Sequence, residues 1–176
     1  MNFPYRFKVV FLSFLAVFIC YIDRVNISVA IIPMQDQFGW SELQVGIILG
    51  SFYFGYMITM ILGGYLADKY GGKKVLGYGL LIWSLFTIIT PFFAYSGLWW
   101  LILIRVLMGL GEGITFPSWH SIYARWIPFN ERTRAVAFTN SGIAAGTVFG
   151  YVVAAAIISN YSWAVSYTHL RAHETS

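Results

Sequence analysis

Long apolar runs, separated by short polar stretches, make up most of the sequence. Each run has about 20 residues or more, which is the length that an α-helix needs to cross the hydrocarbon core of a bilayer. The pattern predicts five transmembrane helices, at residues 8–32, 43–67, 75–95, 97–122 and 135–159. We therefore expect an all-α integral membrane protein.

Several residues are expected to mark where these helices begin and end. Ser41 followed by Gln44 is typical of a capping box, and it predicts the start of the second helix. Pro33, Gly39 and the pair Gly71-Gly72 are expected to lie in the connecting loops.

The composition agrees with a polytopic membrane protein. Of 176 residues, 59% are hydrophobic and only 10% are charged, whereas soluble domains carry about 25% charged residues. Seven Trp, twelve Tyr and fifteen Phe are enough for an aromatic belt at each membrane surface. The single cysteine, Cys20, is expected to be a small packing residue. No Cys/His cluster has the spacing of metal ligands, so we expect neither a metal nor a cofactor.

The distribution of Lys and Arg predicts the orientation. Eight of the eleven fall at one side of the predicted membrane: Arg6, Lys8, Lys69, Lys73, Lys74, Arg125, Arg132 and Arg134. The opposite loops carry Asp36 and Glu42 and no Lys or Arg. The positive-inside rule then places the N-terminus in the cytoplasm. The basic balance of the chain therefore reflects topology, and no nucleic-acid partner is expected.

Four charged residues interrupt the apolar runs: Asp23, Arg24, Arg105 and Glu112. A charge at the bilayer centre costs about 2.5–3.5 kcal/mol on insertion scales, and such residues usually pair or face a water-filled path. With the predicted orientation, Arg24 and Arg105 should lie at similar depth. The four charges sum to zero and indicate a site that handles charge inside the membrane. The plainer alternative is two static ion pairs that join the first and fourth helices.

The fourth apolar run has two further features. Arg105 and Glu112 are seven residues, or two helical turns, apart and should project from one face. Gly109 lies between them and is expected to leave space beside the charges. Pro117 removes one backbone hydrogen bond and is expected to kink the helix.

Small residues recur every four positions in two of the predicted helices. They are Ser51, Gly55, Thr59, Gly63 and Ala67 in the second helix, and Gly142, Gly146, Gly150 and Ala154 in the fifth. Such ridges let helices approach closely. We favour ordinary helix packing over a sliding surface as the role of these ridges.

The loop at residues 64–74 is expected to form a tight basic hairpin. Asp68 would lie at the C-terminus of the second helix, where the helix dipole disfavours an acid. It therefore needs a partner, and Arg132 and Arg134 are candidates.

Residues 64–74 resemble the G-x-L-a-D-[RK]-x-G-x-[RK] signature of the major facilitator superfamily. The matching positions are Gly64, Asp68, Lys69, Gly71, Lys73 and Lys74. Three further segments, 21–26, 105–113 and 126–132, resemble the anion:cation symporters of that superfamily. Together the resemblance covers residues 8–163.

The resemblance implies a fold and a function. Residues 1–164 would supply five of the six helices in the N-terminal half of a twelve-helix transporter, and the C-terminal half would be its partner. The full-length parent would move a small organic anion, such as a sugar acid, together with protons by alternating access. The expected location is a cell membrane, the bacterial inner membrane in particular.

The resemblance and the chemistry together assign roles to individual residues. The planar guanidinium of an arginine matches a carboxylate, so Arg105 is the first candidate to bind the substrate, followed by Arg24. Tyr21 and Tyr56 are expected to line the substrate pocket. Asp23 and Glu112 are the candidate proton carriers, because a carboxyl group in a low dielectric can take up and release a proton near neutral pH. The loop at 64–74 would act as a cytoplasmic gating motif.

Two other functions stay open at this point. The chain could be a scaffold or a channel-like subunit, which would require stoichiometric partners. An intramembrane enzyme would need a nucleophile or a metal constellation, and the sequence offers neither.

The last twelve residues differ from the rest of the sequence. Residues 165–176 are polar and fit no sixth helix. They resemble the translation of a transposase adapter of the kind used in sequencing libraries. We therefore expect this segment to be non-native and to form no part of the fold.

Overall fold

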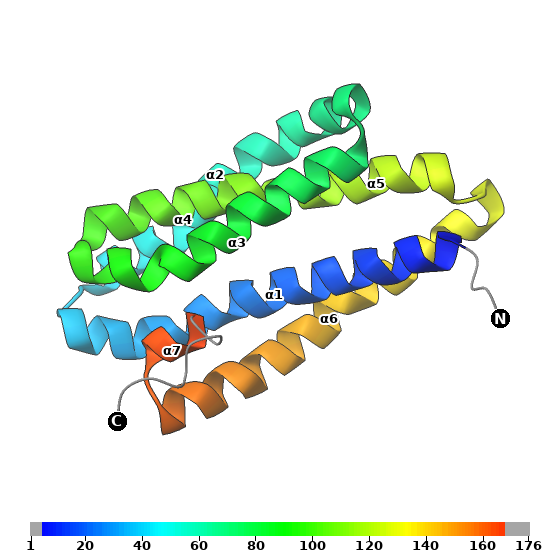
Figure 1. Cartoon of the computed structure of the whole chain (residues 1–176). Helices are drawn as coiled ribbons and strands as arrows, with labels where there is room; N and C mark the ends of the chain where they lie inside the picture. Colours follow the sequence, from blue (N-terminus) through cyan, green and yellow to red (C-terminus); the bar gives the residue numbers. More distant parts are fainter. Residues whose placement is uncertain (1–4, 168–176) are drawn as a thin grey trace.

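The computed structural model describes residues 5–167, and every regular element in this part of the chain is an α-helix. The helices are α1 (Tyr5–Phe38), α2 (Glu42–Tyr70), α3 (Gly72–Ser96), α4 (Leu98–Gly113), α5 (Thr115–Trp126), α6 (Phe129–Asn160) and α7 (Trp163–Tyr167). Figure 1 shows α1 beside α6 in one layer and α2, α3 and α4 in another, with α5 continuing the line of α4.

All five predicted transmembrane helices are confirmed. Within the described residues, α1, α2, α3, the α4–α5 pair and α6 are each long and apolar enough to span a bilayer. The helices extend up to a few residues beyond most of their predicted limits, because the apolar run defines only the part inside the hydrocarbon, whereas the fourth span begins one residue later than predicted, at Leu98. The chain is a multi-pass membrane protein. Most of the predicted non-native tail, 168–176, lies outside the described residues, so the domain boundary after residue 164 stays a prediction.

The predicted helix ends are partly confirmed. The capping box is present. The backbone N–H of Gln44 donates to Ser41 Oγ at 3.4 Å, and the backbone N–H of Ser41 donates to Gln44 Oε1 at 2.9 Å. Gly39 and Gly71 adopt φ values of +66° and +91°, which favour glycine, between consecutive helices. Two residues that were expected in loops lie in helices, since Pro33 lies inside α1 and Gly72 is the first residue of α3. The buried neighbour Met34 anchors this part of α1 in the core, so the loss of one hydrogen bond at the proline does not end the helix.

The fourth span has a break close to Pro117, where a kink was expected. The span divides into α4 and α5 at Ile114, three residues before Pro117. Proline has no N–H for the carbonyl four residues earlier, which here belongs to Gly113, and its ring crowds that carbonyl. The part of the span that contains Arg105 and Glu112, α4, is therefore a separate helix from α5.

Glycines bring the helix backbones of α2 and α4 into direct contact. A Cβ atom added to Gly55 would collide with the carbonyl oxygen of Val106, and one added to Gly109 would collide with that of Phe52. The expectation that Gly109 leaves space beside the charges is therefore wrong, because the backbone of α2 fills that position. Close approach through small residues is the usual way in which membrane helices associate.

The small residues of α6 pack in the same way against α1. Gly142, Gly146, Gly150 and Ala154 are all buried. A Cβ atom added to Gly146 would collide with the carbonyl oxygen of Phe18 on α1. The ridges in α2 and α6 thus serve packing between helices of this chain, which agrees with the interpretation favoured from the sequence.

Gly55→Ala tests this contact. The added methyl group has no room against the α4 backbone, so we expect the free energy of unfolding to fall by about 1–3 kcal/mol. Gly50→Ala, on the same helix with no atom within 4 Å of the added Cβ, is the matched control and should cost little or nothing. Reversible unfolding in mixed micelles measures both. Equal losses for the two variants would contradict the packing described here.

Candidate functional site

A buried ion pair between α1 and α4 lies at the centre of the charged cluster. Arg24 Nε donates to Glu112 Oε1 at 3.1 Å, and the Arg24 Nη2 contacts the same oxygen. The Glu112 side chain is fully buried, and that of Arg24 is 16% exposed. The pair connects the two layers of the fold, since α1 packs mainly on α6 and α4 packs mainly on α2 and α3.

Glu112 has very unequal surroundings at its two oxygens. Oε1 accepts from Arg24 and also from the Cys20 thiol, whose Sγ lies 2.8 Å away. Oε2 is buried and has no hydrogen-bond partner among the described residues. Cys20 was expected to be a packing residue, and its contact with Glu112 was missed. The signal in the sequence was its spacing, because Cys20 lies one helical turn before Arg24.

Aromatic rings surround the other side of Arg24. Its guanidinium carbon lies 4.8 Å from the ring centroid of Tyr21, 5.3 Å from that of Phe52 and 4.9 Å from that of Tyr56. The ring of Tyr53 follows at 6.0 Å. These are cation–π distances, which stabilise a cation more strongly where water is scarce. The predicted residues Tyr21 and Tyr56 therefore lie at the cluster. Phe52 and Tyr53 were missed, although Phe52 lies one helical turn before Tyr56.

Among residues 5–167, Arg105 is the most buried charged residue that forms no ion pair. Its side chain is 2% exposed, and its Nη1 donates to the Met108 sulfur at 3.5 Å. Its guanidinium carbon lies 4.8 Å from the Phe52 ring centroid, and its Nε has no hydrogen-bond partner among the described residues. Arg24 and Arg105 lie against the same ring, that of Phe52, so the structure brings the two arginines together, and their similar depth in the membrane stays a prediction.

Asp23 completes the cluster without forming an ion pair among residues 5–167. It interacts electrostatically with Glu112 and with Arg105. The four charges are thus brought together, but the described residues contain one ion pair at this site and not the two of the static alternative. No group of three acidic, His or Cys side chains within residues 5–167 is placed to hold a metal.

The basic loop after α2 contacts α5. Ser121 Oγ donates to the Asp68 carboxylate at 3.2 Å, and Arg125 donates to the Asp68 carbonyl oxygen at 3.3 Å. The expected partners Arg132 and Arg134 are therefore wrong. Arg132 instead donates to the carbonyl oxygens of Ala124 and Ile127, because α5 reaches Trp126 and lies between the end of α2 and the start of α6.

The other residues of the loop signature differ in exposure. Lys69 donates to the hydroxyl of Tyr65 at 3.4 Å, and Lys73 and Lys74 are exposed. Gly71 makes the turn, and Gly64 has open space beside its Cα.

A double-mutant cycle tests the buried ion pair. Arg24→Gln and Glu112→Gln each leave one buried partner without its counter-charge, so the double variant should lose less stability than the sum of the single losses. We expect a coupling energy of about 0.5–3 kcal/mol from unfolding in mixed micelles. The same cycle with Asp36→Asn, an exposed acid on the same helix as Arg24, should be additive. Additivity for Glu112 as well would contradict the contact.

Known proteins similar to this chain are membrane transporters by name. Over 162 residues the chain is 45% identical to "Probable anion transporter 4, chloroplastic" of Oryza sativa subsp. japonica. It is 44% identical to "Ascorbate transporter, chloroplastic" and to "Sodium-dependent phosphate transport protein 1, chloroplastic", both of Arabidopsis thaliana. Each similarity covers 92% of this chain and 27%, 30% and 32% of the respective relative, so the chain spans about a third of their length or less.

These relatives bear on two of the expectations. Their names describe transporters and not enzymes, which excludes the enzyme alternative. They are chloroplastic plant proteins, so the expected bacterial inner membrane has no support. The family model for the Major Facilitator Superfamily matches residues 13–168, which is most of the sequence and includes the whole charged cluster. The chain therefore belongs to the major facilitator superfamily.

Proposed function

We propose that the transporter to which this chain belongs carries a small organic anion, such as a sugar acid, across a membrane together with protons. The chain spans 27–32% of the relatives named above, so the proposal concerns the longer protein. The observation that carries it is the buried guanidinium of Arg105, which has no ion-pair partner among residues 5–167 and lies on the same helix face as Glu112.

The chemistry of Arg105 supports an anionic substrate. A buried cation is costly unless an anion compensates it, and a carboxylate matches the two-pronged geometry of a guanidinium. Arg105 has N–H donors left over, because its Nη1 donates to a sulfur and its Nε has no hydrogen-bond partner among the described residues. The printed names of the relatives, which specify an anion, ascorbate and phosphate, also support an anionic substrate.

The surroundings of Arg24 support a role for protons. A proton bound to Glu112 would neutralise the one acid among residues 5–167 that pairs with Arg24. Arg24 would keep its position, because the ring faces of Tyr21 and Tyr56 still stabilise it. Its N–H groups would then be free to join Arg105 in binding the anion. Asp23, which interacts with both Glu112 and Arg105, is the second candidate proton carrier.

Transport then follows from alternating access. Protonation from the outer side frees Arg24, and the anion binds between the arginines. The loaded transporter turns inward, where the proton and the anion leave and the Arg24–Glu112 pair forms again. The contact of Asp68 with Ser121 and Arg125 joins α2 to α5 at the basic end of the helices, which supports a gating role for that loop at the cytoplasmic side.

Glu112→Gln in the full-length transporter tests proton coupling. A pH gradient of one unit can drive roughly tenfold accumulation per coupled proton, because one pH unit corresponds to about 1.4 kcal/mol. The variant should lose this accumulation and keep substrate exchange under symmetric pH, measured with labelled anion in proteoliposomes. Glu42→Gln, at the exposed first residue of α2, should keep both. Equal loss of accumulation and exchange would argue for a binding or structural role of Glu112, and loss of uptake on replacing Na⁺ by choline would identify sodium as the coupling ion instead.

Arg105→Lys tests the anion site. Lysine keeps the charge but cannot make two parallel hydrogen bonds to one carboxylate. Since hydrogen bonds to charged groups contribute about 1.5–3 kcal/mol, we expect uptake at low substrate concentration to fall roughly 10- to 100-fold. Arg134→Lys, at an exposed arginine, is the control and should transport normally. Near-normal uptake by the Arg105 variant would remove Arg105 from the site.

A further inference from the structure

The two carboxylate oxygens of Glu112 differ in how many donors reach them. Three donors converge on Oε1, namely the Nε and Nη2 of Arg24 and the thiol of Cys20, whose Sγ lies at 2.8 Å. Oε2 is buried and accepts from no donor among residues 5–167. The Glu112 side chain has no exposed surface, so surface water does not compensate Oε2 either. One oxygen of this buried carboxylate is therefore fully engaged and the other is free.

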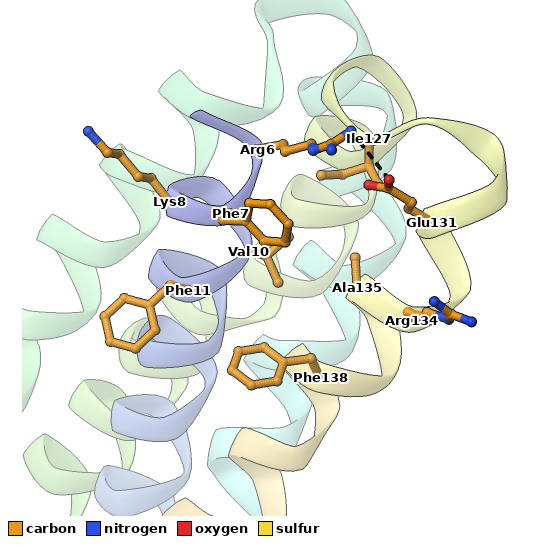
Figure 2. Close-up of a pocket in the computed structure, with 10 residues that line it drawn as sticks. All are labelled: Arg6, Phe7, Lys8, Val10, Phe11, Ile127, Glu131, Arg134, Ala135 and Phe138. Atoms are coloured by element: carbon orange, nitrogen blue, oxygen red, sulfur yellow. Dashed lines mark ion pairs between the residues drawn. The ribbon is translucent and has the colours of Figure 1, made fainter. Parts of the chain in front are cut away.

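The second ion pair among residues 5–167 shows what burial changes. Arg6 on α1 and Glu131 on α6 pair at 3.3 Å beside a groove at the first turns of these helices (Figure 2). Their side chains are 38% and 39% exposed, so water can supply the donors that Arg6 does not. Glu112 has no such supply, and an anionic oxygen without a donor is costly in an apolar interior. A proton is the smallest partner that removes this cost.

Cys20 is placed to determine which oxygen stays free. It lies four residues before Arg24 on α1, so both side chains reach Glu112 from the same face of that helix. The Cys20 side chain is fully buried and packs with side chains of α2, α3 and α4. It therefore has little freedom to turn away from Oε1.

Other titratable side chains act on Glu112 mainly through their charge. They are Tyr21 and Asp23 on α1, Tyr56 on α2 and Arg105 on α4, whereas α3 faces the cluster with Trp83, which does not titrate. The hydrogen bonds to the carboxylate that the structure shows come from Arg24 and Cys20. Of these two donors, Arg24 is the one that the proposed transport cycle releases, so Cys20 is the partner that remains at Oε1.

We propose that Cys20 is a positioning residue for proton coupling, an inference that rests on the function proposed above. Its thiol holds Oε1 of Glu112, so the proton binds to Oε2. When Arg24 turns to the anion, the thiol keeps the neutral carboxyl group in place, and Arg24 returns to the same oxygen after the proton leaves. The Glu112 carboxylate gains one proton at Oε2 and later gives it up, and the thiol keeps its own hydrogen throughout.

Infrared difference spectroscopy of the full-length transporter tests the thiol contact. Subtracting the spectrum of the matching Cys20→Ala variant isolates the S–H stretching band of Cys20, whose frequency rises when its hydrogen bond weakens. Glu112→Gln replaces a charged acceptor by a neutral amide, so the band should move to higher frequency. Glu131→Gln removes the acid of the exposed pair and should leave the band unchanged. An unchanged band in Glu112→Gln would overturn the proposal.

The pH dependence of proton-driven uptake tests the positioning role. A hydrogen-bond donor favours the charged form of a carboxylate, so Cys20→Ala should move the pH of half-maximal uptake upward by roughly half a unit to one unit. Cys20→Ser keeps a donor at this position and should restore the original profile. Ser13→Ala, at a buried residue of the same helix whose hydroxyl donates to the Val9 carbonyl oxygen, should also keep it. Exchange of labelled anion at symmetric pH shows that each variant is folded.

The outcomes distinguish this inference from the proposed function. An unchanged profile in Cys20→Ala, or an equal shift in Cys20→Ala and Cys20→Ser, would overturn the positioning role while Glu112→Gln still abolished proton-driven accumulation. If Glu112→Gln kept full accumulation, the proposed function would fail, and the positioning role with it.

Discussion

The pairing of Arg24 with Glu112 is the interaction on which the arrangement of the charged cluster depends. It joins α1, which packs on α6, to α4, which packs on α2 and α3, so the two layers of the fold meet at a charge pair inside a membrane. An unpaired charge at this depth would be costly, and each partner therefore fixes the position of the other. Cys20 and the surrounding aromatic rings reinforce the same geometry from α1 and α2.

The two arginines of the cluster differ although they lie against the same phenylalanine. Arg24 has an acid, a thiol beside that acid and several ring faces around it. Arg105 has a sulfur, one ring and electrostatic interactions with Asp23, Glu112 and Tyr167, but no ion pair among residues 5–167. The protein thus compensates the charge of Arg24 more fully than that of Arg105, although both guanidinium groups lie against the ring of Phe52. Such an asymmetry suits the proposed site, in which a substrate anion takes the place of the Glu112 carboxylate at the arginines.

Hydropathy alone predicted the five spans and identified the four buried charges, because a charge in a long apolar run stands out in the sequence. It did not predict which charges pair or what Asp68 contacts. Pairing depends on how each helix is rotated about its axis, and that rotation is set by contacts such as Gly55 on Val106 and Gly146 on Phe18. The role of Cys20 was missed for the same reason, since a thiol in an apolar run is normally only a packing group. Pro33 was misplaced because neighbouring core residues hold the helix together around it.

The break of the fourth span at Ile114 divides that span into two rods joined at one residue. Glu112 lies two residues before the joint, and Ser121 and Arg125, which hold the Asp68 loop, lie after it. Any rotation about this joint changes the distance between the buried ion pair and the loop at the membrane surface. Glu112 of the buried ion pair and the residues that hold the Asp68 loop therefore lie on opposite sides of this break.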